Sequence, residues 1–229
     1  MWLKWFKRLI PDRHMPMHVL SGPFRGARIL LRPRISMRKI LGVYEHELNA
    51  WLAAALPRVE RVLDVGANDG YFSIGCAAAL RRLHGHGEVV AFEPEEDICR
   101  LLEESARPYQ GDRLRIRVIP SFVGSGSREG VTALDRVSWQ LGDPGSRQGV
   151  LIKIDVEGAE EDVLDGAASF IRPGNLFLIE AHREEFLTTI PARFAARGLR
   201  LRRIDQQPLR LLGRELRSEN NWWLVSELA

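Results

Sequence analysis

The sequence predicts a single α/β domain in which helices cover both faces of a mostly parallel central sheet. From residue 61 to residue 181, strand-like apolar runs alternate with helix-like segments, and such alternation is typical of parallel sheets with crossover helices. The chain has 229 residues, 45% of them hydrophobic. These values fit one domain, since domains span roughly 50–250 residues, with a short N-terminal addition.

The N-terminal segment, residues 1–17, opens with bulky apolar and basic residues at helical spacing. This pattern predicts a short amphipathic helix over residues 1–12. Two placements are open: either its aromatic side chains pack on the domain, or residues 1–10 make peripheral contact with a membrane surface. Pro11 and Pro16 break the pattern.

Residues 18–57 are predicted to form a hairpin and a helix that pack on the core. The apolar runs 19–20 and 27–31 flank turn-forming residues, which predicts a small β-hairpin within 18–35. From residue 36 to residue 56, apolar positions recur every three or four residues, which predicts one amphipathic helix that stops at Pro57.

Residues 58–229 form the predicted main domain. Its alternating part consists of strand 61–65, helix 70–82, strand 88–92, helix 95–106, strand 114–119, strand 150–154, helix 158–171 and strand 175–181. A helix near 183–197 follows, and then strands at 199–204 and 222–227. We expect these last two strands to pair as a C-terminal antiparallel hairpin around a polar connection.

Composition and charge exclude several classes of protein. The net charge is +3 and the pI is about 9.1, but the arginines are scattered, unlike those of a dedicated nucleic-acid-binding protein. No apolar run reaches the roughly 18 residues of a membrane span, and no secretion signal is evident. Cys76 and Cys99 fall inside predicted helices, which argues against a disulfide framework. We expect a cytoplasmic protein.

A candidate cofactor loop follows the first strand of the main domain. Asp64 lies at the strand end, and Gly66, Asn68 and Gly70 lead directly into a helix, as in a Rossmann-type unit. Dinucleotide folds usually show G-x-G-x-x-G there, suited to a pyrophosphate. The carboxylates of Asp64 and Asp69 would instead repel a phosphate and suit an ammonium group, which favours S-adenosylmethionine over NAD.

Glu93 adds a second signal, because it ends the second strand at a distance suited to the cofactor ribose. It lies 23 residues after Gly70, where an acid accepts hydrogen bonds from both ribose hydroxyls. Ser121, two residues past the third strand, completes the expected cofactor-binding set.

Several longer stretches match one known family. They are Gly42-Val43-Tyr44-Glu45, Asp64-Val65-Gly66-Ala67-Asn68-Asp69-Gly70-Tyr71-Phe72-Ser73, Ala91-Phe92-Glu93-Pro94, Thr132-Ala133-Leu134-Asp135 and Lys153-Ile154-Asp155-Val156-Glu157-Gly158-Ala159-Glu160. Through them the chain resembles the FkbM-type methyltransferases from about residue 42 to residue 180. The resemblance implies a class I methyltransferase fold, S-adenosylmethionine as methyl donor and a hydroxyl oxygen as acceptor, often on a sugar, lipid or polyketide-like metabolite.

Candidate catalytic residues lie at the ends of the fourth and fifth strands. Lys153, Asp155 and Glu157 alternate with apolar residues, so we expect them on one side, although Glu157 is also suited to capping the next helix. Glu180 and His182 share one side of the fifth strand by the same alternation. His182 is the preferred general base, because its unperturbed pKa lies near ~6.5, and Asp155 is the alternative.

The same side chains offer a metal-binding alternative. Asp155, Glu157, Glu180 and His182 carry ligand types that suit magnesium, zinc or iron. Their spacing matches no diagnostic metal motif, and methyl transfer from a sulfonium proceeds with orientation and a single base. We therefore expect no metal.

Two rival functions share this fold. A nucleic-acid methyltransferase would need a basic groove with aromatic residues, whereas the fourth strand ends in an acidic motif, so we do not expect a nucleic-acid acceptor. A catalytically silent scaffold would use the N-terminal helix and the Trp222-Trp223 pair as contact surfaces. The donor-site residues at every expected position argue against the scaffold. No feature of the sequence indicates an oligomeric state.

Overall fold

The protein is built around a seven-stranded sheet, seen in a computed structural model that describes residues 11–137, 149–209 and 221–228. The strand order is β10-β11-β9-β8-β3-β4-β5. The seven strands are β3 (Val59–Val65), β4 (Gly87–Phe92), β5 (Leu114–Ile119), β8 (Gly149–Ile154), β9 (Leu176–Ala181), β10 (Leu201–Ile204) and β11 (Trp222–Ser226). All neighbouring pairs from β9 to β5 are parallel, which confirms the predicted class.

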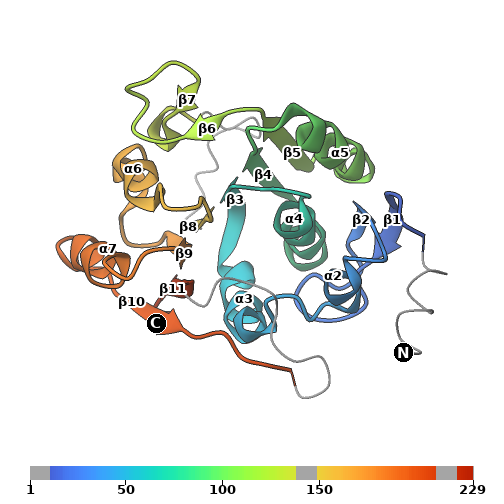
Figure 1. Cartoon of the computed structure of the whole chain (residues 1–229), viewed down its shortest axis with the longest axis horizontal. Helices are drawn as coiled ribbons and strands as arrows, with labels where there is room; N and C mark the ends of the chain where they lie inside the picture. Colours follow the sequence, from blue (N-terminus) through green and yellow to red (C-terminus); the bar gives the residue numbers. More distant parts are fainter. Residues whose placement is uncertain (1–10, 138–148, 210–220, 229) are drawn as a thin grey trace.

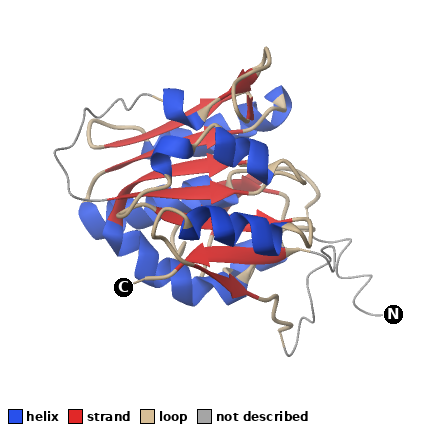
Figure 2. Ribbon diagram, turned by 90° about the vertical axis from the view of Figure 1, so that its left-hand side faces the viewer, coloured by secondary structure: helices blue, strands red, loops and turns tan. Residues whose placement is uncertain are grey.

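Helices cover both faces of this sheet (Figures 1 and 2). One face carries α3 (Asn49–Ala55), α4 (Tyr71–His84) and α5 (Glu96–Ala106), and the other carries α6 (Glu160–Asp165) and α7 (Phe186–Ala195). Successive residues of β3 serve the two faces in turn, as strand geometry requires: Val62 joins the core under α4, and Leu63 joins the core under α6 and α7. Both layers are therefore built from the same buried strands.

The C-terminal hairpin is antiparallel, as predicted, and it extends the sheet. Strand β11 pairs with β10 and also inserts beside β9, antiparallel to both. Trp223 is fully buried, and Trp51 of α3 donates a hydrogen bond from Nε1 to the Ser226 carbonyl at 2.9 Å. The Trp222-Trp223 pair is consequently not the exposed contact surface that a scaffold reading requires, because Trp223 belongs to the core.

The N-terminal hairpin begins earlier than the sequence predicts. Its strands are β1 (Met15–His18) and β2 (Arg28–Leu31), and Val19 and Ala27 continue the pairing with a hydrogen bond of 2.9 Å. Pro16, expected to break the chain pattern, lies inside β1. A proline is tolerated there because β1 pairs with β2 alone within the described residues, which leaves an edge free of ladder bonds.

The predicted helix over residues 36–56 is in fact three short helices. They are α2 (Met37–Leu41), the 3-10 turn η1 (His46–Leu48) and α3. Gly42 ends α2 in a left-handed conformation with φ 74°, and a Cβ there would lie 2.1 Å from the Ser21 carbonyl oxygen. The helix therefore ends where Gly42 contacts the hairpin, and the spacing of apolar residues does not reveal this contact.

The predicted helix 158–171 is also interrupted. Helix α6 stops at Asp165, and a short 3-10 turn, η5 (Ala168–Phe170), follows it. Gly166 lies between them, and a Cβ at this position would meet the Gly124 carbonyl oxygen at 1.9 Å. Backbone of the segment that holds the two-residue strands β6 (Phe122–Val123) and β7 (Val131–Thr132) therefore packs directly against the end of α6.

Strand β2 of the hairpin packs against α4 and α5 (Figure 1), and the Leu20 amide donates a hydrogen bond to the Ile40 carbonyl of α2 at 2.8 Å. The Arg28 amide donates to the Tyr109 hydroxyl at 2.6 Å, and the Leu30 amide donates to the Ser105 hydroxyl at 3.0 Å. The Phe24 ring packs edge-to-face on Tyr71 at a centroid distance of 5.4 Å. The hairpin is thus fixed to α4, the helix that follows β3.

The structure also bears on the predictions about a membrane span and about the two cysteines. Within the described ranges, no helix combines the length and apolar character that a bilayer span requires. The helix expected over residues 1–12, with its membrane-contact alternative, falls largely outside the described residues. Cys76 and Cys99 are free and buried in α4 and α5, as predicted.

Gly75 offers a test of the docking between the hairpin and α4. A Cβ at Gly75 would lie 2.4 Å from the Phe24 ring, so Gly75→Val should overpack this contact and lower the free energy of unfolding by about 1–3 kcal/mol. Gly111→Val is the matched control, because nothing lies within 4 Å of its Cβ position, and its change should stay within about 0.5 kcal/mol. Urea denaturation of the three proteins measures both effects, and equal stability of the two variants would contradict the proposed packing.

Candidate functional site

The candidate site lies where the strand order reverses, beyond the carboxyl ends of β3, β4 and β8. Strand β3 leads outward to β4 and β5 on one side and borders β8 and β9 on the other, and ligands of open α/β sheets bind at such a switch point. A cleft of about 440 Å³ opens there. Its lining consists of Val65, Gly66, Asn68, Phe92, Glu93, Pro94, Glu95, Ser121, Phe122, Val123, Asp155, Val156, Glu157 and Ala159. This volume falls in the range of small-molecule sites, about 300–1,000 Å³.

The charge of this cleft is one-sided. Four carboxylates line it, those of Glu93, Glu95, Asp155 and Glu157, and among the described lining residues there is no lysine, arginine or histidine. A cofactor with phosphate groups would meet only like charge here, whereas a cationic group would be attracted.

Contacts within the protein explain why the loop after β3 has glycine at positions 66 and 70. Gly66 has φ 78°, and a Cβ on it would lie 1.9 Å from the Asp155 carbonyl oxygen. Gly70 has φ 79°, and its Cβ would lie 2.8 Å from Cγ of Leu102 in α5. Gly66 and Asn68 line the cleft, but Gly70 does not, so its glycine serves the close packing of α4 on α5.

Glu93 organises the edge of the cleft. Its carboxylate accepts a hydrogen bond from the Asn68 amide at 2.8 Å and one from the Glu95 amide at 3.1 Å. Asn68 adopts a left-handed conformation with φ 47°, which few residues other than glycine adopt. A carboxylate has about four acceptor positions, so Glu93 retains capacity for a ligand hydroxyl after holding this loop.

Asp64 and Asp69, expected from the sequence to suit a cofactor ammonium, are not among the residues that line the cleft. Asp64 is fully enclosed and accepts a short hydrogen bond from the Ser73 hydroxyl of α4. Asp69 forms a salt bridge with Lys39 at 2.5 Å. The strand alternation explains the first placement, because Asp64 points to the α4 side of β3. The carboxylates that face the cleft are instead those of Glu93, Glu95, Asp155 and Glu157.

Ser121 lines the cleft, and an aromatic neighbour lies beside it. The Ser121 hydroxyl lies 2.8 Å from the Thr132 hydroxyl and also donates to backbone carbonyls. Phe122, which sequence reasoning did not select, is 64% exposed at this wall of the cleft. An exposed phenylalanine in a two-residue strand has no periodic signal, so only the fold reveals it.

A buried lysine, Lys153, connects the end of β3 with the residue that follows β8. Lys153 Nζ lies 2.8 Å from Asp155 Oδ2 and 3.7 Å from Asp64 Oδ1. Burial alone would lower the pKa of Lys153, but the negative charge of Asp155, followed by that of Asp64 and Glu45, outweighs burial and raises it. Burial would raise the pKa of Asp155, but the positive charge and hydrogen bond of Lys153 outweigh burial, so the pKa of Asp155 is lowered. Lys153 and Asp155 are therefore an ion pair.

The three polar residues predicted to share one side at the end of the fourth strand lie near one another: Lys153 contacts Asp155, and Asp155 and Glu157 both line the cleft. Lys153 and Asp155 lie on one side, in contact with each other. Strand β8 ends at Ile154, however, so Glu157 lies in the loop before α6 and lines the cleft from there.

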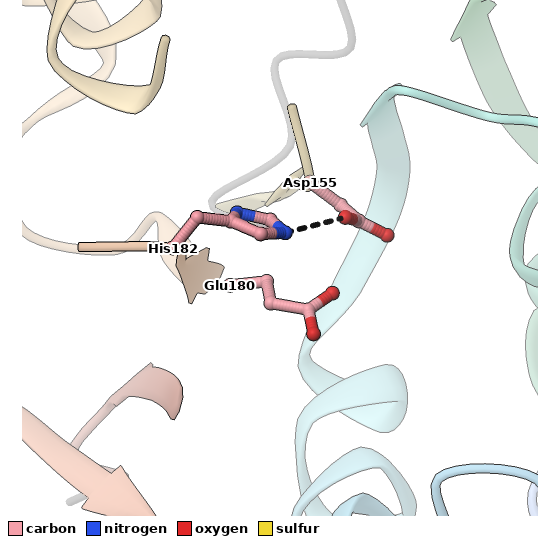
Figure 3. A group of neighbouring side chains, drawn as sticks. All are labelled: Asp155, Glu180 and His182. Atoms are coloured by element: carbon pink, nitrogen blue, oxygen red, sulfur yellow. Dashed lines mark ion pairs between the residues drawn. The ribbon is translucent and has the colours of Figure 1, made fainter. Parts of the chain in front are cut away.

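His182 and its carboxylate neighbours lie beside Asp155 (Figure 3). Its Nδ1 forms a short hydrogen bond with the fully buried Glu160, and its Nε2 faces Asp155 Oδ1 at 3.9 Å. Ligand atoms of Asp155, Glu180 and His182 all lie within 4.8 Å of one another, so this triad of side chains has a geometry that accommodates a cation. Glu160 belongs to a motif quoted above, but its position in the sequence did not assign it a role.

The pKa of His182 is raised above its usual range. Burial would lower this pKa, but the hydrogen bond to Glu160 and the negative charge of Glu180 outweigh burial, with a further contribution from Asp155. Neutral imidazole, the form that accepts a proton, therefore prevails only at a higher pH than for an isolated histidine.

A second cavity adjoins this cluster. It has a volume of about 400 Å³ and is lined by Glu157, Gly158, His182, Arg183 and Asn221. Glu157 lines both cavities, and Asp155 in the first cavity faces His182 in the second. The two cavities thus meet at the Asp155, Glu157 and His182 side chains that the sequence singled out.

Comparison with known proteins places the fold. No protein-family model matches the chain, and no curated protein matches it. Among solved structures, the chain is similar to the methyltransferase FkbM from Methylobacillus flagellatus KT, with 19% identity and a TM-score of 0.56, over 74% of this chain and 44% of that one. The chain therefore spans less than half the length of that relative.

Two shorter solved structures match over nearly their whole length. The Escherichia coli protein yhhF, assigned to the methyltransferases, has 15% identity and a TM-score of 0.51, over 94% of this chain and 99% of that one. A Haemophilus influenzae protein assigned to the methylases has 12% identity and a TM-score of 0.50, over 94% and 100%. Together with the strand order and the two helical layers, these similarities show that the chain has the class I methyltransferase fold.

Proposed function

We propose that the protein is an S-adenosylmethionine-dependent methyltransferase that methylates a hydroxyl group of a small polar molecule, a sugar or a lipid-like acceptor. The observation that carries the proposal is the cleft at the switch point, lined by four carboxylates and, within the described residues, by no cationic side chain. A nucleoside with a sulfonium group suits such a cleft, and a nucleotide with a pyrophosphate does not.

The donor fits the cleft in a definite orientation. Glu93 is placed to accept hydrogen bonds from the ribose hydroxyls, since its carboxylate is already fixed by two backbone amides. Ser121 and the exposed Phe122 ring form the wall suited to the adenine, because aromatic rings stack on bases. Gly66 and Asn68 then lie along the path toward Asp155.

The acceptor belongs in the second cavity. Its described lining is polar, with a carboxylate, an imidazole, a guanidinium and an amide, and includes no large apolar side chain. Such groups hydrogen-bond to hydroxyls, which favours a hydroxylated acceptor. Phosphodiester groups would meet the carboxylates of the adjoining cleft, which disfavours a nucleic-acid acceptor.

The residues at the junction supply the proton transfer. When bound, S-adenosylmethionine would supply an electrophilic methyl group to the acceptor oxygen, with S-adenosylhomocysteine as the leaving group. Glu160 accepts the hydrogen bond from Nδ1 of His182, so Nε2 of the neutral ring is free to take the hydroxyl proton. Asp155 and Glu157 orient the acceptor where the cavities meet, and Asp155 is the alternative base.

Cofactor selection is the first test of the proposal. Isothermal titration calorimetry should show binding of S-adenosylmethionine and S-adenosylhomocysteine and no binding of NAD, because the acidic cleft repels the pyrophosphate. Tighter binding of NAD than of either sulfur nucleoside would overturn the cofactor assignment.

Glu93 tests the placement of the ribose. Glu93→Ala should weaken S-adenosylhomocysteine binding by about 1–3 kcal/mol, the contribution of hydrogen bonds to a charged acceptor, while the domain stays folded. The variant also loses the bonds to the Asn68 and Glu95 amides, so circular dichroism must confirm that the fold is retained. Glu95→Ala is the matched control, since Glu95 lines the same cleft without holding the loop through its side chain. An unchanged dissociation constant in folded Glu93→Ala would remove Glu93 from the donor site.

His182 and Asp155 test the chemistry. His182→Ala should leave donor binding intact and lower turnover by about 10²–10⁴-fold, measured with labelled donor and a panel of hydroxylated acceptors. Because the pKa of His182 is raised and the base must be neutral, the wild-type rate should increase as the pH rises through a value above 6.5.

Three outcomes would revise this mechanism. If His182→Ala keeps near-normal turnover while Asp155→Asn abolishes it, Asp155 is the base. If a chelator removes activity and one divalent ion restores it, the Asp155, Glu180 and His182 triad acts through a metal. If labelled donor methylates RNA and no hydroxylated small molecule, the acceptor class is wrong.

A further inference from the structure

A fixed positive charge lies in the second cavity, beside the proposed base. Among the described residues that line this cavity, Arg183 alone carries a permanent cation, and it does not line the donor cleft. Its guanidinium stays protonated at any pH at which the protein is folded and has five N–H donors. The mechanism proposed above gives this side chain no task, although it lies directly after His182 in the chain.

The position of the Arg183 guanidinium depends on two contacts. A Cβ on Gly158 would lie 3.2 Å from Nε and 3.4 Å from Nη2 of Arg183, so the guanidinium lies close over a residue without a side chain. Gly158 also has φ 90°, a conformation that favours glycine. Cζ of Arg183 lies 5.5 Å from the centre of the Phe186 ring, which is a cation–π distance. These contacts hold the cation at the cavity wall.

The charge of Arg183 is only weakly balanced by the protein. Its ion pair is with Glu185, and the two closest atoms, Nη1 and Oε1, are 3.5 Å apart, longer than a normal hydrogen bond. The two side chains are 58% and 64% exposed. Exposed pairs of this kind contribute little free energy. A carboxylate of a ligand can therefore replace Glu185 at small cost and accept two parallel hydrogen bonds from the guanidinium.

The neighbouring acids favour a carboxylate over a phosphate as the bound anion. Glu157 lines the same cavity, and Asp155 faces His182 where the two cavities meet. A phosphate group with up to two negative charges is repelled by these acids more strongly than a carboxylate with one. The planar carboxylate also matches the planar donors of a guanidinium.

The reacting hydroxyl and the carboxylate fit within one small molecule. His182 and Arg183 are consecutive residues, and both line a cavity of about 400 Å³. Asn221 lines it as well, and its Nδ2 donates to Glu180 Oε1 at 3.2 Å, which orients the Asn221 amide. An acceptor can therefore place a hydroxyl at His182 and a carboxylate at Arg183, with its other hydroxyls near Asn221.

We propose that the acceptor is a hydroxy acid or a sugar acid, and that Arg183 binds its carboxylate. Methyl transfer goes to the hydroxyl oxygen at His182, so Arg183 determines specificity and takes no part in proton transfer. This inference rests on the proposed methyltransferase function. It narrows the acceptor from hydroxylated molecules in general to those that carry a carboxylate.

The test uses pairs of acceptors in which a carboxylate is replaced by its primary amide, such as glucuronate and glucuronamide, galacturonate and galacturonamide, and lactate and lactamide. Rates are measured with labelled donor at saturation. Wild-type protein should methylate the acid of at least one pair with a KM about 10-fold or more below that of its amide. In Arg183→Gln the KM for the acid should rise by about 10-fold or more, while kcat changes by less than about twofold.

Three further variants separate anion binding from other effects. Arg183→Lys keeps the charge and loses the paired donors, so its KM for the acid should be intermediate. Glu185→Gln removes the competing carboxylate and should lower that KM, by up to about fivefold. Arg202→Gln is the matched control, because Arg202 is an exposed arginine of β10 that lines neither cavity, and its kinetics should match the wild type.

The possible failures are distinguishable. If wild-type protein methylates no member of any pair and no neutral hydroxylated molecule, the proposed function is wrong and the inference with it. If it methylates neutral acceptors only, or if Arg183→Gln keeps the preference for the acid, the inference alone is wrong. A methyl ester as product, recognised by release of labelled methanol in mild base, would place the carboxylate at the methyl group instead of at Arg183 and would also overturn the inference.

Discussion

The close approach of the β3 loop to the end of β8 is the constraint on which the site depends. Gly66 lies so near the Asp155 carbonyl that a side chain could not be inserted, and the Asp155 amide donates to the Val65 carbonyl at 3.0 Å. The two strands are therefore joined one residue beyond their ladder. This contact brings Asp155 into the lining of the cleft, and Lys153 lies between Asp155 and Asp64.

The charges at this junction follow from that placement. Because β3 and β8 run parallel and in register, Asp64 lies beside Lys153, and a buried carboxylate gains a buried ammonium as its neighbour. Three further acids lie near this junction: Glu93 and Glu157 line the cleft, and Glu160 bonds to His182. Together these carboxylates make the region around the junction negatively charged. Rossmann-type folds also bind ligands that carry phosphate groups, but the negative charge at this site favours a cationic ligand.

The succession of strands along the chain could be predicted because β4, β8 and β9 each contain a run of apolar residues and β5 alternates apolar with basic residues. The break in the predicted helix 36–56 could not be predicted, because the turn at Gly42 depends on contact with Ser21, and helical periodicity does not encode that contact. The start of β1 was missed for a similar reason, since Pro16 is acceptable only on a strand edge.

For the site, the sequence indicated which residues gather at the switch point but not which way their side chains face. Asp64 and Glu93 both end strands, yet Asp64 points under α4 whereas Glu93 borders the cleft. Phe122 and Glu160 went unassigned because their importance comes from neighbours distant in sequence, the cleft wall for one and His182 for the other.

The strained residues show how the N-terminal unit and the core depend on each other. Asn68 keeps its left-handed backbone because Glu93 holds its amide. Glu45 has the same kind of backbone, and its segment is held by a unit that packs Phe24 against α4 and joins Lys39 to Asp69. The free energy that keeps both left-handed conformations therefore comes from the hydrogen bonds and packing around them.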